Sequence, residues 1–306
     1  MIVKKRLWRR IALVVALAFA VVAVGGCGGG TQDAAKGGKV TVGSKNFTEN
    51  IVMGEMLAQL IEAKTDLQVE RKLNLGGTLV CWEALKKGDL DLYPDYTGTG
   101  LMAILKHDVM YDPDEVYNLV QKEYNEKYKI KWMQPLGFNN TYATAVKQEL
   151  AQEYNLEKTS DLVPYAKDLV FGAEQEFLNR KDGYPGYTEA YGLKFKDVKG
   201  METALKYQAI GEGKVDVIDA FSTDGELISY KLKILEDDKG FFPPYYCVPI
   251  VRMDTLEKYP ELEEVLNTVA GQISDEDMQQ LNYQVKEQGK KPAEVVEAFL
   301  KERGVI

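Results

Sequence analysis

Residues 39–63 read KVTVGSKNFTENIVMGEMLAQLIEA, and this stretch sets the pattern for much of the chain. Its first five residues alternate in polarity and end in glycine, which is typical of a short strand. From residue 48 onward, apolar residues such as Ile51, Met56 and Leu60 recur near the spacing of a helix. The stretch therefore predicts a strand followed by a helix at 48–63.

The same alternation continues up to residue 127. We predict further strands at 67–75 and 89–92 and further helices at 78–87 and 112–127. Strands that alternate with helices indicate an α/β domain built around a largely parallel sheet.

A second series of elements begins near Asn139. It contains predicted strands at 142–146, 168–171 and 215–219, predicted helices near 174–178 and 201–211, an apolar run at 247–251 and closing helices rich in Glu and Lys. We therefore expect two α/β lobes, lobe I from 39–138 plus 246–306 and lobe II from 139–245. Because the chain crosses between them twice, the crossings form a two-segment hinge, and the ligand cleft lies between the lobes.

Composition narrows the class of protein. The 306 residues are 45% hydrophobic and 28% charged, which is typical of a globular chain, and the formal net charge is −9. Five of the basic residues lie in 1–26, so the part that folds is more acidic still, which argues against a nucleic-acid partner. The single histidine, His107, leaves few options for an enzyme, since histidine is the commonest general acid or base.

We expect the first 38 residues to direct the protein to the membrane and to anchor it there. A basic segment at 4–10 precedes an apolar run at 11–24, which is too short to span a bilayer and is typical of a signal peptide over 1–26. Gly25 and Gly26 before Cys27 resemble a lipobox, which predicts a lipidated Cys27 followed by a glycine-rich tether over 27–38. An ordinary secretory signal or an uncleaved anchor is the alternative. On the lipoprotein reading, the protein works outside the cytoplasmic membrane.

Motifs for a metal, a cofactor or catalysis are missing from the sequence. There is no CxxC, GxSxG or HExxH, and residues 38–45 (GKVTVGSK) only approach a phosphate-binding loop, because the lysine is misplaced. Cys81 and Cys247 form a disulfide or remain two buried thiols. We expect no catalytic residues, no metal and no cofactor.

Aromatic residues are the informative ones, since tyrosine occurs 18 times. Tyr96, Tyr142, Phe221 and Tyr245 follow predicted strands or lie where the chain crosses between lobes. Each ring taken singly could be packing. Together they predict a cage of ring faces, which suits a quaternary ammonium ion because that ion has no N–H to donate.

Seven segments resemble a known family: 43–49 (GSKNFTE), 75–78 (LGGT), 89–99 (DLDLYPDYTGT), 138–143 (FNNTYA), 176–186 (EFLNRKDGYPG), 219–225 (DAFSTDG) and 242–245 (FPPY). They are similar to the OpuAC-like substrate-binding proteins of osmoprotectant ABC transporters, which take up glycine betaine, carnitine, choline and related compounds. The resemblance implies a type II periplasmic-binding-protein fold with two lobes that close on the ligand, and no catalysis.

The resemblance also implies roles for individual residues. The cage tyrosines of the family fall on Tyr96, Tyr142 and Tyr245, whereas Phe221 replaces a family tyrosine and so lacks its hydroxyl. The residues that hold the ligand's carboxylate fall on Lys45, Thr99 and Arg180. Glu176 lines the cage, braces Arg180 or is simply a solvated helix residue.

The function implied is capture of a quaternary ammonium osmoprotectant and its delivery to an ABC permease that has a separate ATPase. We expect a monomer held at the membrane by its lipid. Alternatives are a receptor for another small cation such as an amino acid or a polyamine, an extracytoplasmic enzyme, and a sensor lipoprotein. The sequence does not rank glycine betaine, proline betaine, carnitine and choline.

Overall fold

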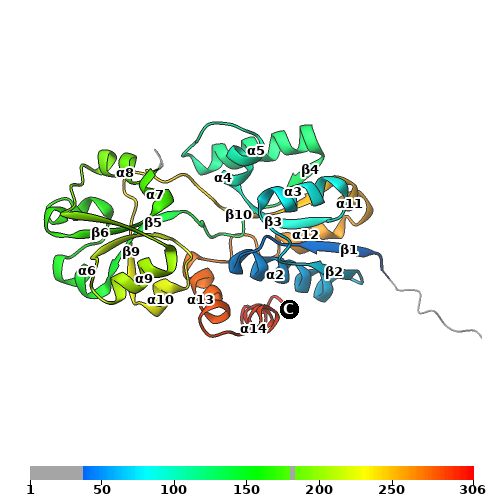
Figure 1. The fold of residues 1–306 in the computed structure, drawn as a ribbon. Helices are drawn as coiled ribbons and strands as arrows, with labels where there is room; N and C mark the ends of the chain where they lie inside the picture. Colours follow the sequence, from blue (N-terminus) through cyan, green and yellow to red (C-terminus); the bar gives the residue numbers. More distant parts are fainter. Residues whose placement is uncertain (1–36, 180–182) are drawn as a thin grey trace, which may run out of the picture. The chain divides into compact units, whose positions relative to one another are not determined.

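A computed structural model describes residues 37–179 and 183–306 of the chain (Figure 1). The predicted signal peptide, Cys27 and Arg180 lie outside these residues. Among the helices described, none is both long enough and apolar enough to cross a membrane.

Lobe I is built on a five-stranded sheet whose strands lie in the order β2-β1-β3-β10-β4. The strands are β1 (Lys39–Gly43), β2 (Gln68–Lys72), β3 (Leu92–Tyr96), β4 (Ile130–Trp132) and β10 (Cys247–Arg252). β1 runs parallel to β2 and β3, whereas β10 runs antiparallel to both of its neighbours. The expectation of a largely parallel sheet is therefore wrong, and the sheet is mixed.

Helices pack on this sheet, and together with its strands they form the core of lobe I. They are α2 (Thr48–Lys64), α3 (Thr78–Lys87), α4 (Thr97–Thr99), α5 (Pro113–Tyr128), α11 (Met253–Lys258), α12 (Glu261–Asn267), α13 (Asp275–Lys286) and α14 (Pro292–Glu302), with a π-helical turn at Gly100–Ile104. α2 packs on the sheet with one face and on α12, α13 and α14 with others. It therefore buries apolar residues nearly all round, among them Met53, Met56 and Leu57.

Lobe II is built on a second five-stranded sheet, in the order β7-β6-β8-β5-β9. Its strands are β5 (Tyr142–Lys147), β6 (Val170–Glu174), β7 (Asp197–Met201), β8 (Val217–Phe221) and β9 (Leu232–Leu235), and its helices are α6 (Gln148–Tyr154), α7 (Gln175–Asn179), α8 (Tyr184–Tyr191), α9 (Thr203–Gly211) and α10 (Glu226–Ser229). β6 runs parallel to β7 and β8, and β5 runs antiparallel to β8 and β9. The lobe has apolar clusters of its own, separate from the core of lobe I.

The chain crosses between the two sheets at residues 138–141 and 243–246, and the two crossings lie side by side. Asn139 and Tyr246 form an isolated antiparallel bridge. The Asn139 Oδ1 atom accepts a hydrogen bond from the backbone N–H of Tyr245 at 2.7 Å, and the Thr141 hydroxyl donates to the Pro243 carbonyl at 2.8 Å. The crossings therefore support each other, although they are distant in sequence.

One strand lies later in the chain than predicted. The prediction placed it at 89–92, but β3 covers Leu92–Tyr96 and includes Pro94. Pro94 is tolerated in the sheet because it lies opposite Pro249 of β10, so two residues without an N–H face each other. As a result, Tyr96 is the last residue of a buried strand and not a loop residue. Similarly, β8 continues through Phe221.

Cys81 and Cys247 are both buried and both free. Of the two alternatives left open by the sequence, the structure has the pair of thiols.

Candidate functional site

Residues of both lobes line a cavity of about 520 Å³. Its lining residues are Lys45, Asn46, Phe47, Gly77, Thr78, Tyr96, Thr99, Asn140, Thr141, Tyr142, Glu176, Phe221, Asp224 and Tyr245. Seven of the eight ligand residues predicted from the sequence are in this set. The eighth, Arg180, lies outside the described residues.

Two of the predicted cage rings are held by strand pairing. Tyr142 begins β5 and Phe221 ends β8, and the two residues are direct partners across the antiparallel pair. Their rings stack with centroids 4.7 Å apart and an angle of 28° between the planes. The ring of Phe177 in α7 lies 5.0 Å from that of Tyr142 on the lobe II side. Cross-strand pairing therefore presents one double aromatic wall to the cavity.

The other two rings come from lobe I and from the second crossing. Tyr96 ends β3 and is only 4% exposed, and its hydroxyl donates to Glu49 Oε1 at 2.6 Å. Tyr245 is half-buried beside α4. A Cβ atom at Gly98 would lie 2.8 Å from the Tyr245 ring, so only glycine at position 98 allows this approach. Burial, followed by the nearby charge of Glu49, raises the pKa of Tyr96 well above its usual value, so this phenol stays a donor.

Lys45 follows β1 and is almost fully buried. Its ammonium lies 2.5 Å from Asp95 Oδ1 and 5.1 Å from the centroid of the Tyr96 ring. Asp95 also accepts hydrogen bonds from the Tyr93 hydroxyl and from the backbone N–H of Tyr96, both at 2.8 Å. Because an ammonium has three N–H donors, the pairing with Asp95 leaves donors for a ligand but offsets much of the charge. The carboxylate-holding role of Lys45 stays a prediction.

The remaining predicted residues lie on two short helices. Thr99 ends α4 and is half-buried, and Glu176 is exposed in the first turn of α7. Both line the cavity, Thr99 from lobe I and Glu176 from lobe II.

Two helices of lobe I begin at the cavity. α2 starts after Phe47 and α3 starts after Gly77, and neither of these residues caps its helix with a side chain. Asn46, Phe47, Gly77 and Thr78 all line the cavity. The first backbone N–H groups of a helix carry a partial positive charge, so this side of the cavity favours a negative group.

Asp224, Asn140 and Thr141 are lining residues that were not singled out. The Asp224 carboxylate accepts hydrogen bonds from the Tyr207 hydroxyl at 2.5 Å and from the Phe221 N–H at 3.1 Å. Burial raises the pKa of the Asp224 carboxyl, and the hydrogen bond from Tyr207 opposes that rise. These bonds fix Asp224 at the end of β8.

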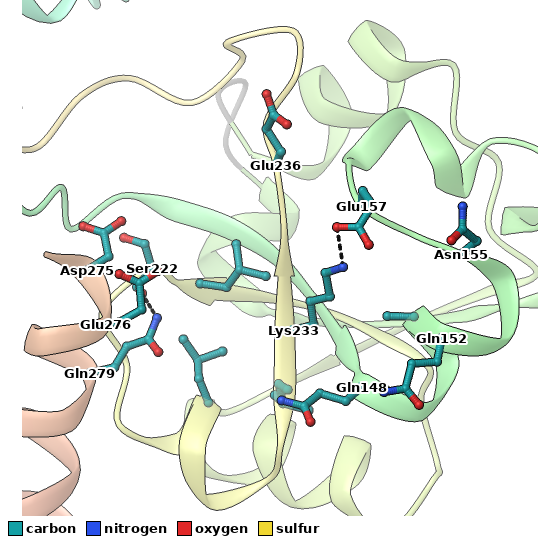
Figure 2. A pocket seen from close by; sticks show the side chains of 14 residues that line it. Gln148, Gln152, Asn155, Glu157, Ser222, Lys233, Glu236, Asp275, Glu276 and Gln279 are labelled. Atoms are coloured by element: carbon teal, nitrogen blue, oxygen red, sulfur yellow. Dashed lines mark hydrogen bonds and ion pairs between the residues drawn. The ribbon is translucent and has the colours of Figure 1, made fainter.

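A second, larger depression of about 950 Å³ borders β9 and α13 (Figure 2). Most of its lining side chains are polar, and some of them bond to other lining residues. Lys233 pairs with Glu157 at 2.6 Å, and the Gln279 side chain donates to the Ser222 carbonyl at 2.7 Å. No aromatic side chain lines it. It therefore lacks the ring faces that the first cavity offers to a cation. Within 37–179 and 183–306, no group of three or more His, Cys, Asp or Glu side chains could hold a metal ion.

Comparison with known proteins gives three concordant results. The OpuAC family model, described as the substrate binding domain of ABC-type glycine betaine transport systems, matches residues 38–302. The carnitine transport binding protein OpuCC of Listeria monocytogenes is 36% identical over 277 residues, which cover 90% of this chain and 88% of that protein. The ergothioneine transport permease/ergothioneine binding protein EgtU of Helicobacter pylori is 37% identical over 267 residues, 87% of this chain but only 48% of that protein.

Solved structures agree. A crystal structure described as a glycine betaine/carnitine/choline ABC transporter superposes with a TM-score of 0.82 at 37% identity and covers 87% of this chain and 98% of that one. Apo YehZ from Escherichia coli superposes with a TM-score of 0.81 at 30% identity and covers 87% of this chain and 99% of that one. The fold class predicted from the sequence, two α/β lobes of the type II binding-protein kind, is confirmed by these matches.

Proposed function

The chain belongs to the family of substrate-binding domains of ABC-type glycine betaine transport systems, and on that premise we propose that its aromatic cavity binds a small betaine. Members of this family bind substrates for transport and are not enzymes. The observation that carries the proposal is that Tyr96, Tyr142, Phe221 and Tyr245, which come from both lobes and a crossing segment, line one cavity.

Ring faces are the right chemistry for the cationic end of a betaine. A trimethylammonium group cannot donate a hydrogen bond, so a polar pocket cannot hold it better than water does. The negative face of an aromatic ring attracts it, by about 2 kcal/mol or more per contact once both are desolvated. The stacked pair Tyr142 and Phe221 keeps this wall rigid, which lowers the entropy lost on binding.

The other end of the ligand is a carboxylate. Lys45 and Thr99 line the cavity, and the N-termini of α2 and α3 begin there, so negative charge is favoured on the lobe I side. We assign Arg180 to the same carboxylate from the sequence resemblance alone. Glu176 then faces the cationic end from lobe II.

Relatives of similar identity are named for different ligands: carnitine, ergothioneine and glycine betaine. These three share a trimethylammonium group and a carboxylate, whereas choline has a hydroxyl in place of the carboxylate. We therefore propose this shared zwitterion as the ligand class. An amino acid or a polyamine is the alternative, and it differs by having N–H donors on its cation.

The protein delivers its ligand to an ABC permease that is served by a separate ATPase. We propose that it does so as a monomer, anchored outside the cytoplasmic membrane through a lipid on Cys27. The lobe boundaries proposed are 39–138 plus 246–306 for lobe I and 139–245 for lobe II. Closure of the lobes on the ligand is the state that the permease recognises.

Calorimetric titration of the purified protein tests the ligand class. The panel contains glycine betaine, carnitine and ergothioneine, with choline, lysine and putrescine as controls. We expect heat of binding with at least one of the three betaines and at least about tenfold weaker binding of choline, since the carboxylate contacts are lost. Binding of lysine or putrescine in preference to every betaine contradicts the proposal.

A further inference from the structure

Glu49 is a buried carboxylate behind the cage. It lies in the first turn of α2 and is only 3% exposed. Its Oε1 atom accepts hydrogen bonds from the Tyr96 hydroxyl at 2.6 Å and from Asn140 Nδ2 at 2.9 Å, and its Oε2 atom accepts one from Asn282 Nδ2 at 3.2 Å. The Glu49 side chain is thus an acceptor for three donors at once.

The three donors come from three different parts of the molecule. Tyr96 ends β3 of lobe I, Asn140 lies in the first crossing segment, and Asn282 lies in α13. Asn282 Nδ2 also donates to the Thr223 carbonyl of lobe II at 2.9 Å. Glu49 therefore connects the cage to a crossing segment and, through Asn282, to the second lobe.

Glu49 does not itself line the aromatic cavity, but Tyr96 and Asn140 do. It borders the neighbouring cavity of about 480 Å³, together with Thr223 and Asn282. Burial raises the pKa of Glu49, and the hydrogen bonds that its carboxyl group accepts oppose that rise. Burying a carboxyl group is costly unless hydrogen bonds compensate for the lost water, so these contacts are strongly specified.

Resting on the proposed function, we infer that Glu49 is a positioning residue for ligand binding: it fixes the Tyr96 ring and the Asn140 amide where they line the cavity. A phenol that donates to a buried carboxyl group cannot swing away from its partner without leaving that group unsatisfied. The same acceptor fixes Asn140, so one side chain sets the relative placement of a cage wall and a crossing segment.

Glu49→Gln is the direct test, because it keeps the size of the side chain but replaces one acceptor oxygen by a donor. Glu55→Gln is its matched control. Glu55 lies on the same helix, is also buried at 5% exposure, and pairs with Arg71 at 2.9 Å, but it does not line the cavity. Titration of both proteins with glycine betaine and carnitine should show at least about tenfold weaker binding for Glu49→Gln and less than about twofold for Glu55→Gln. Equal affinities for the two variants overturn the inference.

A double-mutant comparison shows whether Glu49 acts through Tyr96. Tyr96→Phe removes the donor, and Tyr93→Phe is its control, because the Tyr93 hydroxyl donates to Asp95 from the same strand but does not line the cavity. We expect Tyr96→Phe to weaken binding more than Tyr93→Phe does. We also expect the double variant with Glu49→Gln to bind within about twofold of Glu49→Gln alone. If the loss of affinity in the double variant equals the product of the losses in the two single variants, the inference is overturned.

Two further measurements keep the inference testable under other outcomes. If the wild-type protein binds no betaine, the proposed function fails. A crystal structure of Glu49→Gln then decides the positioning role: unmoved Tyr96 and Asn140 side chains overturn it, and displaced ones support it.

If Glu49→Gln does not fold, the comparison of Tyr96→Phe with Tyr93→Phe tests the same contact from the donor side. Equal affinities of those two variants overturn the inference.

Discussion

The Lys45 ammonium lies 2.5 Å from the Asp95 carboxylate, with both side chains almost completely buried. The residues adjoin two neighbouring strands, since Lys45 follows β1 and Asp95 lies in β3. Lys45 brings a positive charge to the cavity, and Asp95 offsets that charge. A buried pair of this kind is sensitive to the loss of either member, because the other is left as an uncompensated charge.

Asp95→Asn should lower the free energy of unfolding by about 3 kcal/mol, because it leaves the Lys45 ammonium buried without a counter-charge. Urea unfolding followed by circular dichroism measures this. Glu70→Gln is the control: Glu70 pairs with Lys39 at 2.5 Å, but both side chains are exposed, so its loss should destabilise the protein far less than the loss of Asp95. Similar losses for the two variants contradict the prediction.

Removal of a cage ring should weaken betaine binding. Tyr142→Ala, Phe221→Ala and Tyr245→Ala should each cost about 1–2 kcal/mol of binding free energy, because a ring face is lost from the cation. Tyr111→Ala is the control, since Tyr111 is 48% exposed and lies outside the cavity. Phe in place of each of the two tyrosines should cost less than Ala, as Phe221 already supplies a ring alone. Calorimetric titration of all variants with a betaine measures these losses. If Phe and Ala weaken binding equally at both tyrosines, hydrogen bonding and not the ring face holds the cation.

Arg180→Ala should separate the two ends of the ligand. Arg180 lies outside the described residues, and the prediction comes from the sequence. Loss of a bidentate, charge-assisted contact should cost glycine betaine about 2–3 kcal/mol and choline much less, because choline has no carboxylate. Lys at this position should restore binding only in part. Equal losses for both ligands indicate a role in the fold or in closure.

The two buried thiols should be unreactive in the native protein. Burial raises the pKa of Cys81 to about 11 and that of Cys247 well above its usual value, so the thiolate that attacks a reagent is scarce at pH 8. In a Cys27→Ser background, Ellman's reagent should label neither thiol until urea unfolds the protein, and both afterwards. Rapid native labelling contradicts the buried state, and no labelling after unfolding indicates a disulfide.

Cys27→Ser should also release the protein from the membrane while the ligand affinity stays the same. The prediction comes from the sequence, in which Gly25 and Gly26 before Cys27 resemble a lipobox and a glycine-rich stretch follows. Fractionation of expressing cells, together with radiolabelled palmitate, measures anchoring. Membrane retention of the Ser variant after confirmed processing counts against lipidation.

Local sequence patterns predicted most helices and strands well, but they did not predict how distant strands pair. The strand predicted at 39–43 and the helix predicted at 78–87 match β1 and α3 to the residue. The antiparallel direction of β10 could not be read, because it depends on pairing with strands more than a hundred residues earlier. The predicted position of β3 was wrong because Pro94 is tolerated in the sheet only through its pairing with Pro249, which the local sequence does not reveal.

The candidate site was predicted only in part, because some of its contacts join residues that are distant in sequence. Aromatic residues at strand ends and the family resemblance identified Tyr142 and Phe221, whose contact then follows from strand pairing. Glu49 was missed as a site residue, because an acidic residue in the first turn of a helix is ordinarily explained by the helix dipole. Its role depends on Asn140 and Asn282, which lie 91 and 233 positions away in sequence.

The place of β10 between β3 and β4 also governs how the chain reaches its folded state. As the polypeptide is made with its N-terminus first, β1 to β4 emerge early, but the strand that joins β3 to β4 emerges only with residues 247–252. All five strands of the other sheet emerge before it, between Tyr142 and Leu235, so that sheet is complete first. The first-synthesised part of the protein is therefore the last to be finished, and until then its unpaired strand edges need protection from aggregation.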